Sequence, residues 1–276
     1  MALEVPHGIE GGRTELKASW LVGATPFVQV GVLLATGLHQ VDNPAIDSQG
    51  RVYVTYSGSR GQQAPVSVFR VVPGGPREPF VSGIVNATSL AFSPDGRLYV
   101  SSRFDGTVYR VLDDGQYEVV ASDLGLACGV AFAPDGTLFV GDRSGTIFQV
   151  DPQGRTTTLA MLPASVAAFH LAMGPDAALY VTGPTLASYD RVYRIDMSGK
   201  IETVGETFGR PQGLAFDSRG VLHVVEALAG VSGLYRIPSD GRKSMVVSGA
   251  KLVGVAFGAD DRLVVASNDS VWQFSE

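Results

Sequence analysis

The chain has 276 residues, of which 45% are hydrophobic and 17% charged, so most of it can be buried in a packed core and we expect little disorder. A formal net charge of -6 and a pI near 5.2 argue against a nucleic-acid-binding surface, which needs a concentrated basic field. The single cysteine, Cys128, excludes an internal disulfide, and no apolar run reaches the length of a membrane span.

Residues 1–27 form the first distinct segment, and they lack the basic-then-apolar order of a secretory signal. We therefore expect a soluble protein, cytoplasmic as far as this sequence indicates. The stretch VPHGIEGGRTELKASWLVGATPF has alternating apolar positions and glycine-rich turns, and it resembles the last strands of an IPT/TIG immunoglobulin-like domain. Two interpretations stay open, an extension packed on the following domain or the remnant of a truncated neighbouring domain.

Residues 28–276 carry a sixfold internal repeat, which decides the predicted architecture. Six segments align with a spacing of 40 to 46 residues: 43–56, 89–102, 129–142, 170–183, 213–226 and 254–267. Each consists of two apolar runs joined by a turn of the Pro-Asp-Gly kind, followed by a third strand such as VYRV and a more polar fourth strand. The sequence predicts an all-β, six-bladed β-propeller with four antiparallel strands per blade.

The ring must also be closed. The sixth repeat ends at Glu276 directly after its third strand, whereas Val30–Leu38 (VGVLLATGL) has the pattern of a fourth strand and precedes the first blade. We expect this N-terminal strand to complete the last blade, so that the blade has no open edge.

Two positions per blade are expected at one face of the propeller, here called the top face. The first lies where each innermost strand begins, at the mouth of the central channel, and comprises Asp42, Thr88, Cys128, Phe169, Gln212 and Val253, with Asn43 and His170 directly following two of them. The second lies at the end of each second strand and comprises Tyr56, Ser102, Asp142, Gly183, Glu226 and Ser267. Long loops follow the second strands of blades one, four and five, and such loops often carry function.

Arg103 and Arg143 follow the second strands of two adjacent blades, so they could share one anionic group. The alternative is that they form surface-loop ion pairs with Asp105, Asp142 or a carboxylate of the channel. Asp142 and Glu226 are candidates for acid-base roles, or for loop anchors that bind backbone amides.

His170 could accept a proton as a neutral imidazole, or form a hydrogen bond with a neighbouring strand. We interpret Cys128 as a small buried residue, because no partner histidine occurs at a fixed offset.

The segments GVAFAPDGTLFVGD and SLAFSPDGRLYVSS resemble the blades of the NHL-repeat and regucalcin/gluconolactonase superfamily of six-bladed propellers. That scaffold hosts binding proteins, lactonases and lyases. The resemblance implies a calcium site made by a Glu, two Asn and an Asp. Those positions correspond here to Asp42, Thr88, Cys128 and Phe169, of which only Asp42 could serve. We therefore predict no cofactor and no bound metal, with one alternative left open, in which Asn43, Asn86 or His170 supplies calcium ligands through a shifted register.

The sequence thus leaves three functions open. The first is binding of a small molecule in a polar top-face pocket lined by Asp42, Asn43, Tyr56, Arg103, Asp142, Arg143, His170, Gln212 and Glu226. The second is a lactonase-like hydrolase or a lyase that uses Asp42, His170 or Glu226 in acid-base roles. The third is a protein-interaction scaffold. We expect a small-molecule partner, no nucleic acid and no membrane, and the sequence leaves the oligomeric state open.

Overall fold

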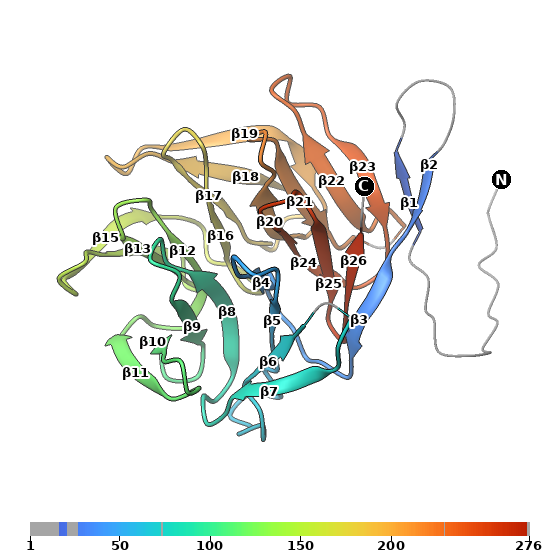
Figure 1. Ribbon diagram of the computed structural model, residues 1–276. Coiled ribbons are helices and arrows are strands. Elements are labelled where there is room, and N and C mark those ends of the chain that lie inside the picture. The colour runs from blue at the N-terminus through green and yellow to red at the C-terminus, as the bar shows by residue number, and fades with distance from the viewer. Residues whose placement is uncertain (1–16, 21–26, 73, 229, 275–276) are drawn as a thin grey trace.

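The computed structural model describes residues 17–20, 27–72, 74–228 and 230–274 (Figure 1). Every regular element in these residues is a β-strand, which confirms the predicted all-β class. Consistently, the described part of the chain contains no helix able to cross a bilayer.

Six sheets surround a central axis. In blades one to five the four blade strands follow one another in chain order from the inner to the outer edge, whereas blade six takes its outer strand from the N-terminal side. Blade one consists of β4 (Ala45–Ile46), β5 (Val52–Thr55), β6 (Val68–Val71) and β7 (Arg77–Val81). Blade two consists of β8 (Ala87–Phe92), β9 (Leu98–Ser102), β10 (Thr107–Val111) and β11 (Tyr117–Ala121). Blade three consists of β12 (Ala127–Phe132), β13 (Leu138–Asp142), β14 (Thr146–Val150) and β15 (Thr156–Met161).

The second half of the ring repeats this order. Blade four consists of β16 (His170–Met173), β17 (Leu179–Thr182), β18 (Asp190–Ile195) and β19 (Ile201–Phe208). Blade five consists of β20 (Pro211–Phe216), β21 (Leu222–Glu226), β22 (Gly233–Ile237) and β23 (Ser244–Ser248). Blade six consists of β24 (Leu252–Phe257), β25 (Leu263–Ser267), β26 (Ser270–Phe274) and the N-terminal strand β3 (Val32–Thr36).

The pairing of β3 with β26 closes the ring, as the sequence predicts. Leu33 lies opposite Trp272 and Ala35 lies opposite Val271 in an antiparallel register. Blade six therefore combines both ends of the propeller chain, and its outer edge is supplied from the N-terminal side.

A hairpin of β1 (Lys17–Trp20) and β2 (Phe27–Val30) adds two strands to the outer edge of blade five, where Ala18 lies opposite Val247. β2 runs across the boundary predicted between residues 27 and 28. Residues 1–16 and 21–26 lie outside the described residues, so the choice between a packed extension and an IPT/TIG remnant stays a prediction.

The core is divided among the interfaces between blades. Among the described residues, the six buried apolar clusters each join one pair of neighbouring blades. The second strands are buried on both faces, because each is packed between two other blades as well as between two strands of its own blade. Their near-continuous apolar sequences follow from this burial.

The inner strands approach one another closely at the axis. A Cβ atom on Gly213 would lie 2.1 Å from Oδ1 of Asn43, and one on Gly254 would lie 2.6 Å from Cα of the same residue. Glycine is therefore required there by the close backbone approach, and the chain before β4 fits tightly into the centre of the ring.

Candidate functional site

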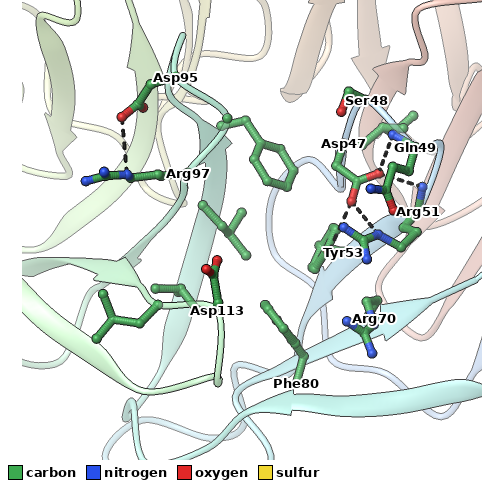
Figure 2. Close-up of a pocket in the computed structure, with 16 residues that line it drawn as sticks. Asp47, Ser48, Gln49, Arg51, Tyr53, Arg70, Phe80, Asp95, Arg97 and Asp113 are labelled. Atoms are coloured by element: carbon green, nitrogen blue, oxygen red, sulfur yellow. Dashed lines mark hydrogen bonds and ion pairs between the residues drawn. The ribbon is translucent and has the colours of Figure 1, made fainter.

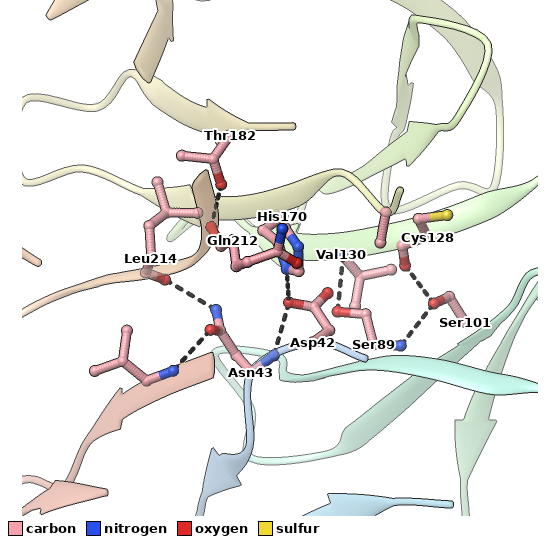
Figure 3. A network of polar contacts seen from close by, with 12 residues as sticks. Asp42, Asn43, Ser89, Ser101, Cys128, Val130, His170, Thr182, Gln212 and Leu214 are labelled. Carbon is pink, nitrogen blue, oxygen red and sulfur yellow. Dashed lines mark hydrogen bonds and ion pairs between the residues drawn. The ribbon is translucent and has the colours of Figure 1, made fainter. Parts of the chain in front are cut away.

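Side chains from the starts of several inner strands converge at the centre of the propeller (Figure 3). Asp42 precedes β4 of blade one, and His170 is the first residue of β16 in blade four. Blades one and four lie opposite each other in a six-membered ring, so these two residues, far apart in sequence, meet across the axis.

Asp42 and His170 form a buried pair. Oδ1 of Asp42 lies 2.5 Å from Nδ1 of His170, and the two residues are 2% and 0% exposed. Oδ1 also accepts a hydrogen bond of 2.7 Å from the backbone amide of Asn43. Oδ2 of Asp42 and Nε2 of His170 have no partner among the described residues. A carboxylate that accepts the Nδ1 proton leaves Nε2 as a proton acceptor, which is the tautomer that a general base requires.

Asn43 connects the inner strands of blades five and six. Its side-chain amide donates to the carbonyl oxygen of Leu214 (2.9 Å), and its Oδ1 accepts from the backbone amide of Val255 (3.0 Å). The amide nitrogen and the oxygen of the Asn43 side chain are thus both bonded to backbone groups, and these bonds fix the backbone next to Asp42.

Arg103 lies on the top face, between the blade-one loop and the channel. Its guanidinium donates to the carbonyl oxygen of Gly58 at 3.3 Å, and within the described residues it has no carboxylate partner. Burial lowers the pKa of Arg103, and the nearby charges of Arg143 and Arg60 lower it further. Two further cations, the exposed Arg60 and Arg143, therefore lie near the half-buried Arg103, and none of the three forms an ion pair within the described residues.

The alternative acidic partners of Arg103 and Arg143 are engaged elsewhere. Asp105 accepts a hydrogen bond from the hydroxyl of Tyr109 at 2.6 Å. Asp142 accepts from the backbone amide of Leu126 at 2.8 Å and from the hydroxyl of Ser144. Both carboxylates serve loops of their own blades, so neither neutralises the arginines.

Arg143 is partly engaged itself, because it donates to the carbonyl oxygens of Ser165 (3.2 Å) and Val166 (2.8 Å). These carbonyls belong to the connection into blade four. His39 also lies near Arg103, and the pKa of His39 is lowered by burial and by the charge of Arg103. Its Nδ1 has no partner among the described residues.

Glu226 is held away from the Asp42–His170 pair. It is 1% exposed, accepts from the backbone amide of Gly209 at 2.6 Å and forms an ion pair of 3.0 Å with Lys243. The Lys243 ammonium also lies 4.5 Å from the ring centre of Phe208. This arrangement resembles the loop anchor of the alternative hypothesis.

The remaining predicted positions lie at the edge of the site. The Tyr56 ring is centred 6.1 Å from the His39 ring. The Gln212 side chain donates to the carbonyl oxygen of Arg210 at 3.3 Å, and the backbone carbonyl oxygen of Gln212 accepts from the hydroxyl of Thr182.

Sequence reasoning missed Arg60 and Lys243. Arg60 lies in the long loop that follows the second strand of blade one, and the length of this loop could have marked it as a candidate. Lys243 follows the turn between a third and a fourth strand, a position to which the repeat assigns no role.

The side chains at the four positions of the calcium site do not fit a calcium ion. The Thr88 hydroxyl donates to the carbonyl oxygen of Asn86, and Phe169 has no donor atom. Burial raises the pKa of Cys128 to about 12, so its thiol stays protonated. In the described ranges, no three His, Cys, Asp or Glu side chains come together as metal ligands.

Comparisons with known proteins agree with this architecture. Residues 81–109, in blade two and its approach, match the family model "WD domain, G-beta repeat". No curated protein matches the sequence. A gluconolactonase from Xanthomonas campestris superposes with a TM-score of 0.74 at 15% identity, over 96% of this chain and 98% of that chain.

Two further solved structures have other functions. One is a catalytically inactive histidine-to-alanine variant of virginiamycin B lyase from Staphylococcus aureus with quinupristin (TM-score 0.63, 15% identity, 95% of each chain). The other is an auxiliary nutrient binding protein from Bacteroides thetaiotaomicron (TM-score 0.68, 11% identity, 87% of this chain and 69% of that chain). At these identities the likeness establishes the fold alone, and the chain is a six-bladed β-propeller whose structural neighbours include gluconolactonase and streptogramin B lyase propellers.

Proposed function

We propose that the protein binds a small organic anion at its top face, with Arg103 as the main contact. The observation that carries this proposal is the unneutralised group of Arg103, Arg143 and Arg60 beside the channel. Partial burial of a guanidinium without a counter-charge costs free energy, and a bound carboxylate or phosphate would offset that cost through paired hydrogen bonds.

The ligand class follows from geometry and charge. Arg103 uses one donor on Gly58, which leaves the rest of its planar fork free for an oxyanion. Arg143 keeps part of its guanidinium free beyond the two backbone carbonyls that it binds. His39 and Tyr56 offer polar edges nearby. Gluconolactonase and nutrient-binding neighbours are named for small molecules, which supports a small ligand of this kind.

Calorimetric titration with gluconate, citrate and glucose 6-phosphate tests the proposal. We expect at least one of these anions to bind, and Arg103→Gln to weaken its binding by about ten- to a hundredfold, since a charge-assisted bidentate contact is lost. Arg155→Gln is the matched control, because Arg155 is an exposed arginine whose ion-pair partner among the described residues is Asp151, across a turn. Equal affinity in the two variants, or no binding of any of the three anions, contradicts the proposal.

A second candidate function is lactone hydrolysis or elimination with His170 as the general base. It is supported by the Asp42–His170 pair, in which Nδ1 is bound and Nε2 is free. The virginiamycin B lyase variant that lacks a histidine is described as inactive, so a propeller of this shape can depend on one. Because His170 is fully buried, this chemistry requires the centre of the ring to open to substrate. Glu226 is a weaker candidate because Lys243 already neutralises it.

An assay of glucono-lactone hydrolysis, with and without calcium, tests this second function. We expect His170→Gln to abolish turnover and Asp42→Asn to reduce it by roughly a hundredfold or more, because the ring loses its oriented tautomer. Glu226→Gln should retain turnover if Glu226 is only a loop anchor. Absence of lactonase activity in the unmodified protein rejects this function and leaves anion binding untouched.

A further inference from the structure

A cleft of about 550 Å³ opens between blades one and two (Figure 2). It is lined by turns between first and second strands, which lie on the face opposite the ends of the second strands and therefore opposite Arg103. Its walls are the β4–β5 turn, the β8–β9 turn and the end of β10. Its volume lies within the range of small-molecule sites in proteins. Nothing in the proposed function uses this cleft, and its residues do not contact the Asp42–His170 pair.

The floor of the cleft is aromatic. Tyr53 is buried, and its ring lies edge-on to Phe80 (5.2 Å between ring centres) and to Phe92 (5.4 Å). Contacts such as Tyr53–Phe92 recur at other blade interfaces, as in Tyr99–Phe132. The distinctive member is Phe80, which sits at a bulge in the outer strand of blade one.

The equivalent bulged position is aliphatic in four of the other outer strands: Leu34, Val120, Leu159 and Val246. In blade four the register shift falls instead on residues 205–207. A β-bulge redirects its side chain, and here the redirected side chain is a phenyl ring that lines the cleft. Blade one thus adds an aromatic surface that the repeat itself does not require.

The charged side chains around this floor are of two kinds, those paired with an opposite charge and one that is unpaired. Three arginines at the rim are each paired with a carboxylate: Arg51 with Asp47 (2.6 Å), Arg70 with Glu78 (2.9 Å) and Arg97 with Asp95 (3.2 Å). Asp113 has neither an ion-pair nor a hydrogen-bond partner for its carboxylate in the described part of the chain. Figure 2 shows that carboxylate directed into the space between the two walls. The one uncompensated charge in the cleft is therefore negative.

We infer that this cleft binds a small organic cation, an ammonium group carried on an apolar body of about one ring. The ammonium group would neutralise Asp113, and the apolar body would cover Phe80 and Phe92. The face of an aromatic ring attracts cations and also packs against apolar groups. The Arg70 guanidinium already lies 5.2 Å from the ring centre of Phe80. An anion would instead meet the unpaired carboxylate of Asp113 and arginines that are already neutralised.

Titration with benzyltrimethylammonium and phenethylammonium, followed by ligand-observed NMR and calorimetry, tests this inference. We expect both cations to bind, whereas phenylacetate, which has a similar ring but the opposite charge, should not. Asp113→Asn and Phe80→Leu should each weaken binding by about tenfold, since each removes one attraction for the cation.

Asp114→Asn is the matched control, because Asp114 is the neighbouring exposed carboxylate and accepts a backbone hydrogen bond within its own turn. Phe80→Leu restores the aliphatic side chain found at this position in other blades, so it should keep the fold, which thermal unfolding checks. Failure of both cations to bind, stronger binding of phenylacetate, or equal effects at Asp113 and Asp114 overturns the inference. Arg103→Gln should leave cation binding unchanged, which separates this site from the proposed anion site.

Discussion

Residues at equivalent positions of the repeat have different tasks in this propeller. Asp142 and Glu226 both end second strands, and both carboxylates are used by backbone amides of the adjoining connections. Arg103 follows the same kind of strand end, yet it lies near other cations and has no carboxylate partner in the part of the chain that the structure describes. Position in the repeat therefore assigns a residue to a face, and its immediate neighbours decide whether its charge is free for a ligand.

His223 shows the same principle in the core. It occupies the column of Tyr53, Tyr99, Phe139 and Tyr180, and its ring packs 4.7 Å from that of Phe257. Burial lowers the pKa of His223 below its ordinary value of 6.5. The unfolded chain therefore binds a proton at His223 more readily than the folded chain does. The contribution of the neutral His223 to the free energy of unfolding is fully present above pH 6.5, and it is lost as the pH falls from 6.5 toward the folded pKa.

We accordingly expect the free energy of unfolding in urea to be smaller at about pH 5 than at about pH 7.5, and His223→Phe to reduce that difference. A phenyl ring fits the column and does not titrate. His39, whose pKa is also lowered, will keep part of the pH dependence. Tyr99→Phe is the control, since it changes the same column without removing a group that titrates in this range. A His223→Phe variant with an undiminished pH dependence would show that another group is responsible.

At the scale of elements, the closing strand β3 has the largest structural consequence. It covers the outer edge of β26, and Trp272 and Val271 of that strand are buried. Without β3, blade six would expose an unpaired edge and part of the cluster that joins blade six to blade one. The hairpin of β1 and β2, by contrast, extends a blade that already has four strands.

A pair of truncations distinguishes these two roles. Deletion of residues 2–30 removes the hairpin but keeps β3, and we expect it to change stability by about 1 kcal/mol or less. Deletion of residues 2–37 removes β3 as well, and we expect the loss of several kcal/mol, or aggregation through the open edge. Thermal unfolding and size-exclusion chromatography of the two proteins measure this. Equal stability of the two truncated proteins would contradict a closing role for β3.

At the scale of the whole molecule, circular closure brings distant residues together. Asp42 and His170 meet because blades one and four face each other across the axis, and Asn43 then reaches the inner strands of blades five and six. One short segment before β4 thus contacts three other blades, namely the opposite blade four, blade five and the neighbouring blade six. The two candidate sites lie on opposite faces, the cationic group at the top and the cleft with Asp113 at the other.

The sequence by itself determined the number of blades, the four-strand repeat and the closing strand, because the period of apolar runs and turns is local information repeated six times. It also predicted which residues lie at the channel mouth. Only the tertiary structure decided which of them touch. The pairing of Asp42 with His170, the neutralisation of Glu226 by Lys243 and the exposure of Asp113 beside Phe80 all depend on contacts across blades or on a bulge. Hydrogen bonds and ion pairs act over a few ångströms in space, whereas a repeat records only separations along the chain.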